Sequence, residues 1–148
     1  MEPWWAVKGA PTPKASTTTI GLDPDLQIDL PDAGTYAFEM WINYTGGTLG
    51  SSDLKLAVNY TGQSTFGVWG VNGINTSSTT SVTVNGQALG TNTLTLGTSG
   101  GTFYTVDLKG SLFATGPGNL GLYWAQGTSS ATATNLRQGC WMRVTQLA

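Results

Sequence analysis

Residues 36–44 read Tyr-Ala-Phe-Glu-Met-Trp-Ile-Asn-Tyr, and this stretch decides the fold class. Successive side chains of a β-strand point to opposite faces of the sheet, so an alternation with a period of two predicts a strand. Large side chains along one whole face predict that the strand is central and that this face lies in the core. The core face carries Tyr36, Phe38, Met40, Ile42 and Tyr44, and the opposite face carries Ala37, Glu39, Trp41 and Asn43.

Similar patterns recur on both sides of this strand, and no stretch repeats its apolar residues with a helical period. The Asn85-Gly86 pair between two β-branched runs predicts a tight hairpin turn. Short strands at this spacing predict an all-β chain that forms a single antiparallel β-sandwich or jelly-roll-like domain. The further strands are expected at residues 4–8, 16–20, 26–30, 54–60, 66–71, 81–84, 91–96, 103–108, 112–113, 120–124 and 140–147.

Residues 1–15 differ in composition from the rest of the chain and are predicted to form an extended N-terminal arm on a domain that spans residues 16–148. Pro11 and Pro13 cannot donate ladder hydrogen bonds. Beyond a short strand at its start, we therefore expect the arm to make few such bonds and to serve attachment to a partner more than folding.

The composition argues against several classes of function. Six Lys and Arg against eight Asp and Glu give a net charge of -2, which provides no basic surface for nucleic acid. The absence of His removes the common catalytic triads and imidazole metal sites. No apolar run reaches the length of about 18 residues that a membrane span needs, and residues 1–5 lack the features of a signal peptide. The sequence therefore predicts neither an enzyme nor a metal or other cofactor.

Cys140 is the single cysteine, so the chain can form no internal disulfide. It lies on an alternating apolar face beside Met142, and this position predicts a small buried side chain. A nucleophilic thiol would need a neighbouring base, and the chain has no His to supply one.

The carboxylates give two weaker signals. Four aspartates cluster at residues 23–32 without the spacing of a calcium-binding loop, so solvated turn carboxylates are expected, with calcium binding as the alternative. A glycosidase would need two carboxylates that face each other at a cleft, and outside this cluster only Glu39 and Asp107 lie in expected strands. Glu39 is expected to face solvent or a second subunit. The clustered residues are Asp23, Asp25, Asp29 and Asp32.

Tryptophan is the most informative residue type in the chain. Trp4 and Trp5 lie in the expected arm, and Trp41 lies on the face opposite the core, where it meets either a second sheet or another chain. Trp124 and Trp141 are expected in the core or at a subunit interface. Because aromatic side chains are enriched at interfaces, all five are candidates for contact with a partner. A carbohydrate-binding platform would also use exposed Trp and Tyr, and it remains the alternative.

Two blocks of sequence carry a resemblance to a known family. The first comprises Ser-Thr-Thr-Thr-Ile at 16–20, Asp-Pro-Asp-Leu-Gln at 23–27, Leu-Pro at 30–31 and Thr-Tyr-Ala-Phe-Glu at 35–39. The second comprises Leu-Tyr-Trp-Ala-Gln at 122–126, Ala-Thr-Ala-Thr at 131–134, Gly139 and Met-Arg-Val at 142–144. With Asp-Leu-Lys at 53–55, these blocks resemble a β-domain of bacteriophage virion proteins. Residues 62–101 match nothing in that pattern.

The resemblance implies a structural protein of the virion. The chain resembles a capsid decoration, or cement, protein. Such a protein binds the major capsid protein of the assembled shell as a homotrimer, and it stabilises the shell by mass action. Such a protein would be made in the host bacterial cytoplasm and would lie on the exterior of the capsid, without nucleic acid or membrane as a partner. The alternative is a tail or head-fibre domain that recognises a host-surface glycan or receptor.

Overall fold

The computed structural model describes residues 2–48, 50–90 and 92–148, which form twelve strands and no helix. The larger sheet has the spatial order β1 (Trp4–Val7), β12 (Trp141–Gln146), β4 (Gly34–Thr45), β9 (Tyr104–Ala114), β6 (Ser64–Ile74) and β7 (Ser81–Ala88), with β2 (Thr12–Lys14) and β11 (Thr134–Leu136) beside this path. The smaller sheet has the order β3 (Gly21–Leu30), β10 (Gly118–Gln126), β5 (Leu54–Tyr60) and β8 (Leu94–Leu96).

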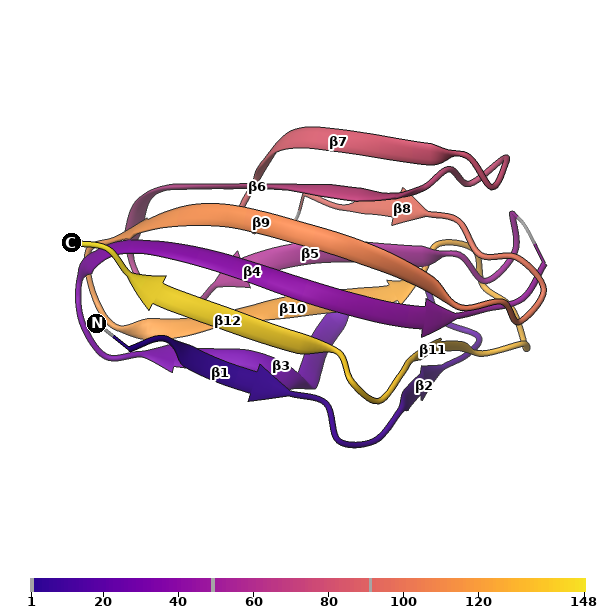
Figure 1. Ribbon diagram of the computed structural model, residues 1–148, viewed down its shortest axis with the longest axis horizontal. Coiled ribbons are helices and arrows are strands. Elements are labelled where there is room, and N and C mark those ends of the chain that lie inside the picture. The colour runs from indigo at the N-terminus through magenta and orange to yellow at the C-terminus, as the bar shows by residue number, and fades with distance from the viewer. Residues whose placement is uncertain (1, 49, 91) are drawn as a thin grey trace.

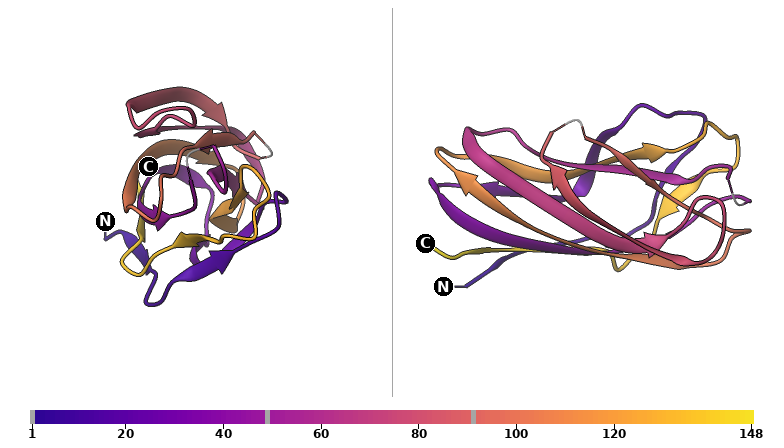
Figure 2. Two further views of the ribbon diagram at one scale, coloured as in Figure 1. Left: turned by 90° about the vertical axis from the view of Figure 1, so that its right-hand side faces the viewer. Right: turned by 90° about the horizontal axis from the view of Figure 1, so that it is seen from above.

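The two sheets pack face to face, and both ends of the chain lie at the same end of the molecule (Figures 1 and 2). Neighbouring strands within each sheet are antiparallel. The prediction of an all-β antiparallel sandwich is therefore confirmed, whereas its jelly-roll form stays a prediction.

The core lies between the sheets and follows from the alternation in the sequence. The predicted core face of residues 36–44 is buried, and β5 and β10 oppose it with Leu and Val side chains. Two of its tyrosines keep their hydroxyl groups satisfied: Tyr44 Oη donates to Gly97 O at 2.6 Å and Tyr36 Oη to Asp32 O at 2.7 Å. Each large apolar side chain that is fully buried contributes about 1.5–3 kcal/mol. The core prediction for this strand is confirmed.

Several strands differ from the sequence-based expectation. Residues 16–20 form no strand, because Ser16 has a φ of 56° and turns the chain out of an extended conformation. Residues 112–113 continue β9 instead of forming a separate strand. The short strand β11 was not expected; it lies between β2 and the end of β4. Of the expected strand at 91–96, residues 94–96 form β8, and Thr91 lies outside the described residues.

The Asn85-Gly86 pair does not form the predicted hairpin turn. It lies inside β7, where the register with β6 shifts between Trp69 and Val71. Gly86 has a φ of 70°, a conformation that glycine adopts without steric cost, so the pair forms a β-bulge. The hairpin between β6 and β7 turns at residues 75–80 instead.

The N-terminal segment is built into the larger sheet. Strand β1 pairs with β12 through four registered residues, and β2 pairs with β11. The amide of Lys8 also donates to Cys140 O at 2.8 Å. The expected short strand at the start of this segment is confirmed as β1. The expectation of few ladder hydrogen bonds beyond that strand is wrong for residues 12–14, because β11 presents a strand edge to which they add.

Candidate binding face on the large sheet

The candidate site is the outer face of the larger sheet, which we define as the face that points away from the smaller sheet. The strands of this sheet lie in the order β1, β12, β4, β9, β6 and β7 (Figure 1), and alternate positions along them supply the side chains of the outer face. One row of registered residues crosses the whole face. That row runs Val7, Trp141, Trp41, Asp107, Asn72 and Thr83. Because registered residues have neighbouring Cβ atoms, the row places aromatic and polar groups side by side.

One border of this face is apolar. Trp5 is 55% exposed and Val7 is 62% exposed, and Trp141 is half-buried next to them. The rings of Trp5 and Trp141 lie 5.6 Å apart between centroids, at an interplanar angle of 54°. The Arg143 guanidinium lies over the Trp5 ring at 5.4 Å from its centroid. We call Trp5, Val7 and Trp141 the tryptophan edge.

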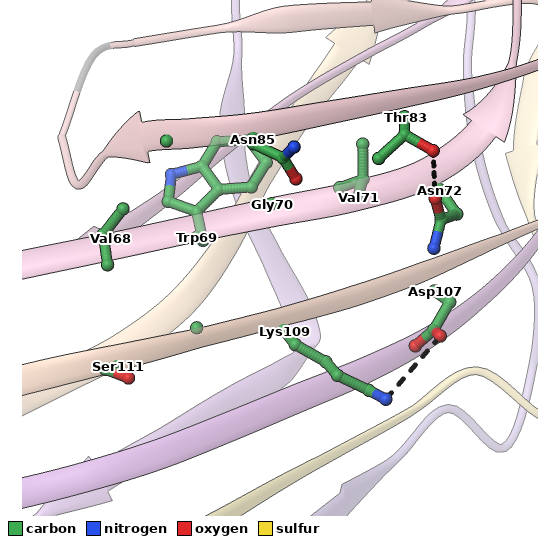
Figure 3. A pocket seen from close by; sticks show the side chains of 12 residues that line it. Val68, Trp69, Gly70, Val71, Asn72, Thr83, Asn85, Asp107, Lys109 and Ser111 are labelled. Carbon is green, nitrogen blue, oxygen red and sulfur yellow. Dashed lines mark hydrogen bonds and ion pairs between the residues drawn. The ribbon is translucent and has the colours of Figure 1, made fainter.

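The part of the face over β4, β9, β6 and β7 is hollowed by two adjoining depressions. One, with a volume of about 340 Å³, lies over β6, β7 and β9, and Figure 3 shows the side chains that line it. The other, of about 300 Å³, is lined by Trp41 and Phe103 among others. Asn72 and Asp107 line both depressions, so they stand between them. We call the two depressions together the central groove.

The first depression has a local cause in the backbone. Gly70 lies opposite Lys109 on the outer face, and a Cβ atom at Gly70 would approach Val84 O to 2.9 Å. The bulge at Asn85 brings β7 close at this point, so no side chain fits over Gly70 and the surface stays hollow.

The charges of the outer face are paired. Glu39 and Arg143 form an ion pair across β4 and β12, and Lys109 Nζ lies 3.9 Å from Asp107 Oδ2 on β9. The structure thus places each carboxylate of the candidate glycosidase pair, Glu39 and Asp107, beside a cation. Pairs at an exposed surface contribute little to stability, so their main effect is to leave the face without a strong net charge.

The five predicted tryptophans separate into two groups. Trp124 is fully buried, with its Nε1 donating to Asp23 Oδ2 at 2.9 Å, and Trp4 packs on the core against Tyr36. Trp5, Trp41 and Trp141 lie on the outer face. The three come from chain positions far apart, and the strand order β1-β12-β4 brings them together.

Asp23 is not the solvated turn carboxylate that the sequence suggested. It is fully buried, and Lys8 Nζ, which is also fully buried, lies 3.0 Å from its Oδ1 and 2.8 Å from Asp25 Oδ2. The same Oδ1 accepts the amides of Asp25 and Leu26. The prediction failed because the cation that neutralises Asp23 comes from the N-terminal segment. In the described part of the chain, no three Asp, Glu, His or Cys side chains gather to hold a metal ion.

Cys140 is buried, as predicted. Its Sγ lies 3.3 Å from both N and O of Asn43, and burial raises the pKa of its thiol. A raised pKa keeps the thiol protonated and unreactive at neutral pH.

Sequence reasoning missed Phe103, Asn72 and Asp107 as neighbours of Trp41. Phe103 is 61% exposed just before β9, with Arg137 at 4.7 Å from its ring centroid. An aromatic residue that follows two glycines in a connection is a signal for an exposed ring, and Gly100 and Gly101 precede it. Nothing local in the sequence marks Asn72.

Comparisons with known proteins identify no family. No family model and no curated protein matches the chain. Among solved structures, the chain is similar at 10% identity to one described as the structure of infectious bursal disease virus Gx strain, with a TM-score of 0.23. The match covers 97% of this chain and 39% of that one, so the chain spans well under half of its length. At this TM-score the likeness carries no argument about fold or function. Among the described residues there is no helix of the length and apolarity that crossing a membrane requires.

Proposed function

We propose that the protein is a structural component of a bacteriophage virion, a decoration protein that binds the assembled capsid shell and stabilises it. The observation that carries the proposal is the tryptophan edge: Trp5 and Val7 are more than half exposed beside Trp141 and form an apolar border of the sheet. The resemblance of residues 16–39 and 122–144 to a virion β-domain supports the same proposal. The function requires no catalytic residue.

The tryptophan edge has the composition of an interface centre. Tryptophan and arginine are the residue types that dominate binding energies at interfaces, and Arg143 here lies over Trp5 while it pairs with Glu39. Covering the exposed parts of Trp5 and Val7 removes apolar area from water at a gain of about 25 cal/mol per Å². A ligand that binds only the assembled shell shifts the assembly equilibrium toward the shell.

The proposal includes a homotrimer on the capsid exterior with the major capsid protein as partner. The homotrimer rests on the same resemblance to a virion β-domain. Light scattering of the purified chain measures the oligomer directly. A monomer in solution that is also a monomer on the particle would contradict the trimer while leaving attachment intact.

The test of attachment uses phage particles that lack the chain and the purified chain added back. We expect the chain to bind in far more copies than a tail fibre and to raise the temperature at which the particles release their genome. Replacing Trp5 and Val7 by Ser should lose both effects, because these side chains are exposed and their loss spares the core. Phe66→Ser is the matched control, since Phe66 is 52% exposed on the same sheet away from the tryptophan edge.

Two results would contradict the proposal. One is binding in few copies at the tail, as located by electron microscopy. The other is undiminished shell binding by the chain with Trp5→Ser and Val7→Ser, since attachment would then use another surface. Circular dichroism of each variant shows whether the β-fold is retained.

A further inference from the structure

The central groove has the amphipathic lining that a sugar ring requires. A sugar presents an apolar face of C–H groups and a rim of hydroxyl groups. Trp41 and Phe103, which are 38% and 61% exposed, supply aromatic surface at one end of the groove. Asn72, Thr83 and Asp107 supply polar atoms in the same registered row as Trp41. Each depression has about 300 Å³ or more, the lower end of the range for small-ligand sites.

Asn72 and Asp107 form a donor and acceptor pair. Thr83 Oγ1 donates to Asn72 Oδ1 at 2.5 Å, which uses the amide oxygen and leaves the amide nitrogen as a donor. Figure 3 shows this nitrogen turned toward β9, on the side where Asp107 lies. Asp107 is registered with Asn72, and its carboxylate only accepts. Two adjacent hydroxyls of a sugar match this pair, one accepting from Asn72 and the other donating to Asp107.

The charge of the groove selects a neutral ligand. Asp107 and Lys109 lie 3.9 Å apart and nearly cancel each other's charge, so the polar pair offers no strong attraction to an ion of either sign. Among the described residues, Lys109 lines one depression and Arg137 lies against Phe103 at the other, which is fewer cations than a surface for nucleic acid gathers.

From this geometry we infer that the central groove is a binding site for a neutral saccharide of one or two rings, with Trp41 and Phe103 against the apolar face of the sugar and Asn72 and Asp107 on its hydroxyls. The groove lies beside the tryptophan edge on the same face, and none of its four named residues belongs to that edge. A surface saccharide of the host cell is the source this site would meet on a particle exterior.

The test titrates the full ¹⁵N-labelled chain with neutral disaccharides and follows amide shifts by NMR. The probes are cellobiose, maltose, lactose and N,N′-diacetylchitobiose, with sialyllactose as the anionic comparison. We expect at least one neutral probe to shift the amides of residues 72, 83, 105 and 107 together with the Trp41 indole. Phe103→Ala should weaken binding about tenfold, and Phe66→Ala, a change of the same type at an exposed site outside the groove, should not.

The polar pair allows a sharper test. Asn72→Asp keeps the shape but replaces the donor by an acceptor, and should weaken binding about tenfold or more. The double variant Asn72→Asp with Asp107→Asn exchanges donor and acceptor, and should recover most of that loss. Because Asn72→Asp also sets two carboxylates side by side, thermal unfolding of both variants is measured with binding, and a recovery seen in stability alone contradicts the inference.

Four outcomes would overturn the inference. They are no shift with any neutral probe, shifts confined to the tryptophan edge, tighter binding of sialyllactose than of the neutral probes, and loss of shell binding rather than sugar binding in Asn72→Asp. The last outcome would make the groove part of a protein interface. Asn72 and Phe103 lie outside the tryptophan edge. A negative result in the sugar titration therefore leaves the shell assay of Trp5→Ser and Val7→Ser unaffected, and each proposal can fail without the other.

Discussion

At the scale of single residues, the structure holds an ionisable group where solvent hardly reaches it. Asp53 is 3% exposed just before β5, and its Oδ1 accepts from the amide of Thr98 at 3.3 Å and from the Thr98 hydroxyl at 3.5 Å. Burial raises the pKa of Asp53 above its ordinary value of 3.8, against the opposing effect of these hydrogen bonds. The carboxylate therefore orders the Thr98 backbone at a cost in stability when it is ionised.

Asp53→Asn should stabilise the protein at neutral pH and flatten its pH dependence. Since the folded state holds the Asp53 proton more tightly than the unfolded state, the free energy of unfolding falls as pH rises from about 3.8 through the folded pKa. Asparagine keeps an oxygen for Thr98 and removes the ionisation. Denaturant unfolding at pH values from about 4 to 7 measures the effect as a gain for the variant that grows with pH and then levels off.

Asp32→Asn is the control, because Asp32 is exposed in the turn before β4. It should show no comparable gain. Equal curves for the wild type and Asp53→Asn across this range would show that burial of the carboxylate carries no penalty.

At the scale of elements, β7 shows how one bulge shapes both an edge strand and a surface. The bulge at Asn85 and Gly86 offsets the register with β6, so that Gln87 pairs with Trp69 and Val84 with Val71. Val71 and Trp69 both stay in the core. The extra residue of β7 lies on the outer face opposite Gly70, where the central groove begins.

Gly86→Ala should destabilise the protein by about 1 kcal/mol, because an L-residue other than glycine strains at a φ of 70°. No atom lies within 4 Å of a Cβ built at Gly86, so the cost comes from the backbone alone. Thermal unfolding measures it. Gly116→Ala is the matched control: it also has open space around the added Cβ and has no positive φ. A loss in Gly116→Ala as large as that in Gly86→Ala would contradict the assignment to backbone strain.

At the scale of the whole molecule, the N-terminal segment ties the two sheets together. Strand β1 adds to the larger sheet, while Lys8 at its end reaches Asp23 and Asp25 of β3 in the smaller sheet. Asp23 in turn accepts from Trp124 of β10. A buried pair of this kind contributes little net stability when intact, but removal of one partner leaves a buried charge uncompensated.

Deletion of residues 2–13 should therefore leave a protein that is unfolded or close to it. The loss of the Lys8 partner alone costs about 3–5 kcal/mol, a large part of an ordinary total of about 5–15 kcal/mol. Loss of the β1 pairing and of Trp4 from the core adds to this. Circular dichroism and thermal unfolding of the truncated chain measure the result.

Lys8→Met in the full chain separates the contribution of the buried ion pair from that of the strand pairing. It keeps β1 and β2 and removes only the charge of Lys8. It should unfold at a lower temperature than the wild type and a higher one than the truncated chain. If the truncated chain unfolds at the temperature of the full chain, residues 2–13 are an attachment arm after all.

The sequence by itself determined the fold class and the core. Alternation along residues 36–44 and 54–60 is a property of consecutive residues, and the side chains of a strand cannot change faces without a shift of register. The outward position of Trp41 and the burial of Cys140 followed from the same pattern.

The tertiary structure alone decided the candidate sites. Trp5 and Trp141, Asn72 and Asp107, and Lys8 and Asp23 are neighbours only because of strand order and register, which no local pattern encodes. The Asn85-Gly86 pair favours a left-handed backbone locally, and such a backbone serves a hairpin turn or a bulge equally well. The length of the neighbouring strand β6 decided between the two, because β7 continues its pairing beyond the bulge as far as Val68.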